Sequence, residues 1–286
     1  MKTGRRTLLT AAAIAALTPR LSEAQPSQEK PMTSHTYHDA ILHYRDNGKT
    51  DAPALLLLHG GLGTAADDFA PLLPRLHPHY RVIENDTRGH GQSTRGSVPL
   101  TYAQIAADAK HLIDTLRLNT YHILGFSDGG TAAYHLALND ERVQSILTVG
   151  ANWHSSQIEP ARDMYESLTP DFLRENMPAQ VAAYEQQNPQ PDLATLTADL
   201  RRLWLDNSTT GYPNERVAAI KQPILAVRGE DDFLLNLPDW AALRKQNPAA
   251  HLLHIPFAGH EAIKAQPDIL WAAIQTFHQH QPAQTP

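Results

Sequence analysis

The feature that most constrains the fold of this chain is an alternation of short apolar runs with segments of helical patterning. A run as apolar as Ala54–His59 fits a strand that is buried on both faces of a parallel sheet. Because strands separated by helices imply crossover connections, the sequence predicts an α/β fold with a mostly parallel, twisted sheet and helices on both faces. The other predicted strands are Ala40–Tyr44, Tyr80–Glu84, Tyr121–Phe126, Ser145–Val149, Pro223–Arg228 and His251–Pro256, and the predicted helices between them are Tyr102–Leu116, Gly129–Leu138 and Pro238–Gln246.

Residues 153–222 interrupt this alternation. They contain amphipathic stretches, such as Ala179–Gln187 and Leu193–Leu205, and no convincing strand. The segment is too long for a loop and short for an independent domain, so we interpret it as a helical cap over one end of the sheet. The sequence therefore predicts one catalytic domain, formed by residues 37–152 and 223–280, that carries a helical insertion.

The amino terminus has the pattern of an export signal. Basic residues precede the short apolar stretch Leu8–Leu17, small residues follow, and cleavage after Ala24 fits this pattern. The pair Arg5-Arg6 resembles a twin-arginine signal, and the apolar stretch is too short for a membrane span, which needs about 20 residues. We expect residues 1–24 to direct export through the twin-arginine translocase to the periplasm or beyond, without a stable membrane anchor. Residues 25–36 are predicted to be a linker, and residues 281–286 a disordered polar tail.

Composition excludes several other classes of protein. The chain has no cysteine, which excludes disulfides, thiolate catalysis and cysteine-bound metal centres. Its formal net charge of −6 disfavours nucleic-acid binding. His77-Pro78-His79 and His278-Gln279-His280 lack a carboxylate at a metal-ligand spacing, and no phosphate-binding or dinucleotide motif is present. We therefore expect a small-molecule substrate and no metal, cofactor or nucleic acid; the sequence does not indicate the oligomeric state.

The strongest chemical motif is Gly125-Phe126-Ser127-Asp128-Gly129, which lies between a predicted strand and a predicted helix. This is the G-x-S-x-G nucleophile elbow in the strand–turn–helix setting that it requires. Side chains at positions 125 and 129 would collide with neighbouring elements in so sharp a turn. The sequence predicts that Ser127 is the nucleophile and that the backbone N–H of Asp128 faces a developing oxyanion.

A second glycine-rich turn, His59-Gly60-Gly61-Leu62-Gly63, follows the strand Ala54–His59. Together with the elbow it predicts an oxyanion hole in which the N–H of Gly61 lies opposite the N–H of Asp128. Leu62 is the alternative donor.

These motifs, with Asp86-Thr87-Arg88-Gly89-His90-Gly91-Gln92-Ser93, resemble those of the α/β-hydrolase superfamily, in its capped, small-molecule branch. The resemblance runs from about Ala40 to His278 and is weakest in the cap. The family order of serine, acid and histidine places the acid in Gly229-Glu230-Asp231-Asp232, with Asp232 favoured over Asp231, and the histidine at His260. A serine at the elbow separates the chain from the dehalogenases and epoxide hydrolases of this fold, which use aspartate.

The resemblance implies a cofactor-independent serine hydrolase that cleaves an ester, lactone or amide through an acyl-enzyme. The alternatives are a non-catalytic ligand-binding homologue, or a carbon–carbon hydrolase or perhydrolase that uses the same triad. Leu62 and Trp153 are candidate substrate contacts, and Trp204 and Tyr184 are further aromatic residues of the cap that either line a pocket or simply pack.

Asp128 is a further candidate substrate contact. The elbow is similar to that of the valacyclovir hydrolase (biphenyl hydrolase-like) group, in which an aspartate after the nucleophile receives the α-ammonium of the substrate. The alternative is that Asp128 only stabilises the first turn of its helix, which contributes about 0.3–1 kcal/mol.

Overall fold

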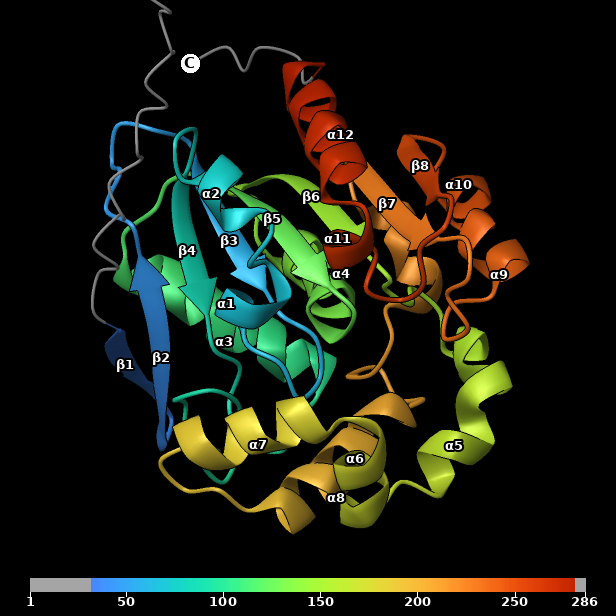
Figure 1. Cartoon of the computed structure of the whole chain (residues 1–286). Helices are drawn as coiled ribbons and strands as arrows, with labels where there is room; N and C mark the ends of the chain where they lie inside the picture. Colours follow the sequence, from blue (N-terminus) through green and yellow to red (C-terminus); the bar gives the residue numbers. More distant parts are fainter. Residues whose placement is uncertain (1–31, 281–286) are drawn as a thin grey trace, which may run out of the picture.

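The computed structural model describes residues 32–280 (Figure 1). The expected export signal, the expected linker up to Pro31 and the polar tail lie outside the described residues. An eight-stranded sheet has the strand order β1-β2-β4-β3-β5-β6-β7-β8. The strands are β1 (Thr33–Tyr37), β2 (Ala40–Asp46), β3 (Ala54–Leu58), β4 (Arg81–Asn85), β5 (Tyr121–Phe126), β6 (Val143–Val149), β7 (Ile224–Gly229) and β8 (Ala250–Ile255).

Six of the strands, from β4 to β8 in spatial order, pair in parallel, and β2 is antiparallel to both β1 and β4. This confirms the prediction of a mostly parallel sheet. The prediction of a linker over residues 25–36 was wrong for its last four residues, because Thr33 already pairs with Tyr44 in the hairpin of β1 and β2. Strand β1 lacks a continuous apolar run because it lies at the sheet edge, where only His35 of its five residues is buried.

The sheet separates two apolar cores. Successive side chains of a strand point to opposite faces, so Leu56 and Leu58 of β3 join one core while Leu55 and Leu57 join the other. One face is covered by helices α3 (Tyr102–Thr115), α4 (Asp128–Asn139), α9 (Leu237–Ala241) and α10 (Leu243–Gln246); the other is covered by α1 (Ala65–Asp68), α2 (Leu73–Leu76), α11 (Ala262–Ala265) and α12 (Pro267–Gln279). The single helix predicted over Pro238–Gln246 is thus two short helices.

The cap between β6 and β7 consists of helices only. In Figure 1 its helices lie beyond the carboxyl ends of the parallel strands, at the lower edge of the view. Its elements are η1 (Ser155–Ala161), α5 (Arg162–Glu166), α6 (Pro170–Asn176), α7 (Pro178–Gln187), α8 (Leu193–Trp204) and η2 (Asn214–Ala219).

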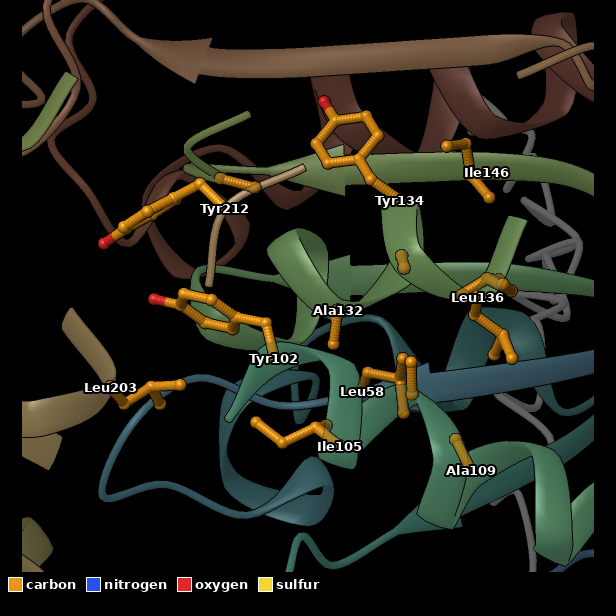
Figure 2. Packing of buried hydrophobic residues seen from close by; sticks show 14 of the residues in the cluster. Leu58, Tyr102, Ile105, Ala109, Ala132, Tyr134, Leu136, Ile146, Leu203 and Tyr212 are labelled. Atoms are coloured by element: carbon orange, nitrogen blue, oxygen red, sulfur yellow. The ribbon is translucent and has the colours of Figure 1, made fainter. Parts of the chain in front are cut away.

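The cap shares the first core with the sheet. Leu203 of α8 and Tyr212 belong to the same buried cluster as Tyr102 and Leu58 (Figure 2), and the rings of Tyr102 and Tyr212 are 5.1 Å apart. Residues 32–152 and 223–280, the sheet with its covering helices, are called the catalytic half, and apolar packing anchors the cap to it. Within residues 32–280, every helix is either too short or too polar to cross a membrane.

Candidate active site

The turn between β5 and α4 has the strained geometry that a nucleophile elbow requires. Ser127 has φ +50° and ψ −117°, a conformation that L-residues rarely adopt. A Cβ on Gly125 would come within 2.6 Å of the Gly129 carbonyl oxygen, and one on Gly129 within 2.1 Å of the Leu58 oxygen. Only glycine fits at either position, so the steric reason given for these two residues is confirmed.

Three predicted side chains from three strand ends form one hydrogen-bonded chain. His260 Nε2 lies 3.0 Å from Ser127 Oγ, and His260 Nδ1 lies 3.0 Å from both carboxylate oxygens of Asp232. Asp232 is 2% exposed, and its Oδ1 also accepts the Leu234 N–H at 3.0 Å. Asp231, the alternative acid, is exposed, and no bond joins it to His260. The geometry thus brings Ser127, His260 and Asp232 together.

Gly61 faces Asp128 across the same site. A Cβ on Gly61 would meet Asp128 Oδ2 at 2.7 Å and the Trp204 ring at 2.9 Å, so the backbone approaches closely because position 61 is glycine. Within the described residues the backbone N–H groups of Gly61 and Asp128 have no acceptor in the protein. Gly61 lines the cavity that contains Ser127, whereas Leu62 does not. This arrangement favours Gly61 over Leu62 as the second donor to an oxyanion.

The carboxylate of Asp128 is buried and is bonded by neutral donors from two other elements. Tyr102 Oη donates to Oδ1 at 2.9 Å, and Trp204 Nε1 of the cap donates to Oδ1 and Oδ2 at 3.0 and 2.9 Å. Burial raises the pKa of Asp128, while the bonds from Trp204 and Tyr102 act in the opposite direction. Its contacts therefore extend beyond the first turn of its own helix.

Ser127 opens into a cavity of about 460 Å³ between the strand ends and the cap. The cap contributes apolar side chains, among them Met164, Leu168 and Phe172, and the catalytic half contributes three carboxylates. No lysine or arginine of the described residues lines this cavity. The carboxylates are Asp68, Asp128 and Glu261.

Two predicted substrate contacts do not line this cavity. Trp153 is 4% exposed and its Nε1 donates to the Asp239 carbonyl at 3.1 Å. Neighbouring residues of an extended chain point to opposite sides, and here Asn152 meets the cavity instead. Leu62 packs in the first core, in a left-handed turn with φ +59°, and lines a neighbouring cavity. Of the two other aromatic candidates, Trp204 lines the Ser127 cavity and Tyr184 the neighbouring one.

His59 holds two glycine-rich turns in place. Its Nδ1 donates to the Gly60 carbonyl at 2.7 Å, and its Nε2 accepts the Thr87 N–H at 2.9 Å. Burial lowers the pKa of His59 to about 4, so the ring is neutral and can accept at Nε2.

Within residues 32–280 no group of three histidines and carboxylates could hold a metal ion.

An α/β sheet with a serine at a strained strand–helix turn, bonded to a histidine and an aspartate from later strand ends, is the arrangement of an α/β hydrolase fold. The model of the alpha/beta hydrolase fold family matches residues 53–217, more than half of the chain. The chain therefore belongs to the α/β hydrolase fold family.

Individual relatives are distant but similar over most of their length. The RutD protein of Agrobacterium fabrum, which is named as a carbamate hydrolase, is 27% identical over 82% of this chain and 97% of its own. The solved enol-lactonase of Burkholderia xenovorans LB400 is 21% identical over 87% of this chain and 100% of that chain, with a TM-score of 0.68. A meta-cleavage product hydrolase, CumD, is 20% identical over 86% and 97%, with a TM-score of 0.69. These two structural similarities show the fold alone.

Sequence reasoning did not find Tyr102, which donates to Asp128, or Asp68 and Gln180, which line the Ser127 cavity. Trp204 was a candidate pocket residue, but its bond to Asp128 was not predicted. None of them lies in a motif, and their periodicity is that of ordinary helical packing. Only the folded chain brings them to Ser127.

Proposed function

We propose that this protein is a cofactor-independent serine hydrolase that cleaves a small ester, lactone or amide. The observation that carries the proposal is the hydrogen-bonded chain Ser127–His260–Asp232 beside a cavity. In it, His260 is the general base, and Asp232 holds the imidazole in the tautomer that can accept a proton from Ser127.

The reaction proceeds in two halves. Ser127 Oγ transfers its proton to His260 Nε2 and bonds to the substrate carbonyl carbon, while the N–H groups of Gly61 and Asp128 stabilise the oxyanion. The bond to the leaving group then breaks, and His260 returns the proton to the leaving atom. Water attacks the acyl-enzyme with His260 again as base, the carboxylic acid is released, and the proton returns to Ser127.

The test is covalent labelling followed by an activity panel. A fluorophosphonate probe should label the wild-type protein at Ser127 and leave Ser127→Ala unlabelled. An unlabelled wild type would support a non-catalytic ligand-binding protein instead. Purified protein is then assayed on matched esters, lactones, amides, carbamates and a carbon–carbon hydrolase substrate, with hydrogen peroxide added in a separate arm for perhydrolysis. Turnover confined to the carbon–carbon or peroxide arm would replace the ester, lactone or amide assignment.

We propose further that Asp128 favours acyl groups with an α-ammonium. Among residues 32–280, three carboxylates and no lysine or arginine line the cavity, and Asp128 follows the nucleophile directly. A buried carboxylate bonded only by neutral groups pairs strongly with a cation and repels an anionic acyl group.

Matched esters with and without the α-amino group test this preference in wild type and Asp128→Ala. We expect the aminated ester to be preferred by about tenfold in wild type, and the preference to disappear in the variant. Equal turnover of the two esters by wild type, or an unchanged preference in the variant, would leave Asp128 with a structural role.

We also propose that the protein is exported through its Arg5-Arg6 signal. Expressed in a bacterial host with a working twin-arginine pathway, it should accumulate in the periplasm with an intact mass that begins near Gln25. Replacing both arginines by lysine should hold the precursor in the cytosol. Full-length wild-type protein found only in the cytosol of that host would contradict the proposal.

A further inference from the structure

A second cavity, of about 290 Å³, lies next to the one that contains Ser127. Its walls come from the Gly60–Gly63 turn, helix α1, His90, Gly91, cap helix α7 and Lys264 of α11. Gly63, Asp68 and Gln180 line both cavities. The two spaces therefore adjoin at these residues, and a molecule larger than the first cavity has room to continue into the second.

Asp68 is the charged group at this junction. Its Oδ2 accepts the Gly60 N–H at 2.9 Å, and a Cβ on Gly63 would meet the same oxygen at 2.7 Å, so the carboxylate lies directly against the turn. Asp68 is 7% exposed, and its Oδ1 lies 4.0 Å from Lys264 Nζ without a hydrogen bond within the described residues. Lys264 is bonded more closely to Glu261, at 2.6 Å. One oxygen of a buried carboxylate thus remains available to a hydrogen-bond donor.

His90 also lines this cavity and is held in a neutral form. It is 3% exposed, and its Nδ1 donates to the Arg88 carbonyl at 3.0 Å. Its Nε2 is buried and has no hydrogen-bond partner in residues 32–280. Because burial lowers the pKa of His90 to about 3, the ring is neutral and Nε2 carries a lone pair. The charged groups of the wall are thus the Asp67 and Asp68 carboxylates and the Lys264 ammonium, which is bonded to Glu261.

We propose that the second cavity is a subsite for the leaving portion of the substrate, and that it selects alcohols or amines carrying a further hydroxyl or ammonium group. This inference rests on the proposed function. In that reaction His260 protonates the leaving atom, so the leaving portion lies on the side of His260. Glu261 follows His260 directly along the chain and lines the first cavity, and Lys264, one helical turn further on, lines the second. The leaving portion would pass Gly63 and Gln180, and its donor would meet Asp68.

Esters of one neutral acyl group, butanoate, provide the test. The 2-hydroxyethyl ester is compared with its propyl isostere, and the 2-(dimethylamino)ethyl ester, protonated at neutral pH, with its 3-methylbutyl isostere. We expect kcat/KM to favour the donor-bearing member of each pair by about tenfold in wild type. In Asp68→Asn, which keeps an acceptor oxygen but loses the charge, the ammonium preference should fall to about twofold or less while the hydroxyl preference persists.

A second variant fills the cavity without changing its charge. Ala183 of α7 lines the second cavity and not the first, so Ala183→Phe should lower kcat/KM for the 3-methylbutyl ester, relative to the methyl ester, by about tenfold. Ala182→Phe, at an exposed position of the same helix, is the matched control and should leave that ratio unchanged.

The outcomes separate the subsite from the reaction. If Ser127→Ala still hydrolyses the esters, the proposed function itself fails. If Ser127→Ala is inactive but wild type hydrolyses the two members of each ester pair equally well, the subsite proposal is overturned and the assignment as a hydrolase remains. It is also overturned if Ala183→Phe discriminates by the length of the acyl group instead of the alcohol.

Discussion

The catalytic half and the cap contribute to one cavity in opposite ways. The catalytic half supplies hydrogen-bonding and charged groups from four strand ends, after β3, β5, β7 and β8, where backbone pairing in the sheet holds each turn. The cap supplies mainly apolar surface, and its only hydrogen bond to the elbow within the described residues is from Trp204 to Asp128. Under the proposed function, the difference teaches that the sheet would determine which reaction is possible, while the cap would determine which molecule reaches Ser127.

The physical reason is that hydrogen bonds and apolar contacts differ in how much change of geometry they tolerate. A proton transfer needs donor and acceptor about 3 Å apart, which a strand-end turn in a paired sheet can maintain. Apolar contacts are not directional, and side chains of similar volume can replace one another at small cost. The four predictions that follow probe the two regions in order of decreasing effect.

The largest expected effect is in the catalytic half. Ser127→Ala and His260→Ala should each lower kcat by about 10⁴-fold or more, because the triad acts as a unit, and the double variant should lose little beyond either single one. Steady-state kinetics on the best ester, with melting temperatures as a folding control, check this. If the losses in kcat of the two single variants multiply in the double variant, the two residues act independently and the prediction is wrong.

The second prediction separates the two neighbouring carboxylates. Asp232→Asn should lower kcat by about 10³- to 10⁴-fold, since an amide favours the wrong imidazole tautomer. Asp231→Asn, the matched control on an exposed side chain, should stay within about twofold. The same kinetic assay decides, and a severe Asp231 variant beside a mild Asp232 variant would reverse the assignment of the acid.

The third prediction concerns the loss of stability at acidic pH, which should come from histidines of the catalytic half and not from the cap. Burial is the main cause that lowers the pKa of five histidines outside the cap, to about 3 for His90 and His278 and to about 4 for His35, His59 and His122. The cap holds one histidine, His154, which is partly exposed. Unfolded histidines titrate near about 6.5, so the unfolded chain binds more protons between pH 6.5 and 4, and stability falls as the pH falls through that window.

Three carboxylates of the described residues oppose this loss. Burial raises the pKa of Asp68 and Asp86 to about 6 and also raises the pKa of Asp128, which favours the folded state as the pH falls. The five histidines outnumber the three carboxylates, and each excess proton contributes about 1.4 kcal/mol per pH unit. Urea unfolding at pH 7, 6 and 5 measures the slope, and His122→Gln should flatten it. A free energy of unfolding that does not change between pH 7 and 5 would contradict the prediction.

The smallest effect is expected at the contact between cap and elbow. Trp204→Phe removes the indole donor to Asp128 and should lower kcat/KM by about two- to tenfold, with a melting temperature lower by a few degrees. Trp271→Phe on α12, which does not line the Ser127 cavity, is the matched control. A Trp204 variant as active and as stable as this control would show that the indole bond to Asp128 contributes neither to turnover nor to folding.

Sequence reasoning succeeded where a residue type is required by local geometry. Gly125 and Gly129 flank Ser127 because no side chain fits there, and that requirement is visible in the motif. It failed where the direction of a side chain depends on distant partners. Trp153 was expected in the pocket, but it donates to the Asp239 carbonyl, and the linker was expected to continue through Thr36, where β1 has already begun.

By itself, the sequence determined the sheet and the elbow, because apolar periodicity and steric exclusion act over a few neighbouring residues. The order of serine, acid and histidine was implied only by the resemblance to a known family. Only the tertiary structure decided that Asp232 rather than Asp231 meets His260, that Tyr102 and Trp204 meet at Asp128, and that Asp68 joins two cavities. These contacts link residues as far apart as Asp128 and Trp204, and their geometry depends on how the cap packs on the sheet. Packing of that kind minimises the volume and the exposed apolar surface of the whole chain, so no local segment encodes it.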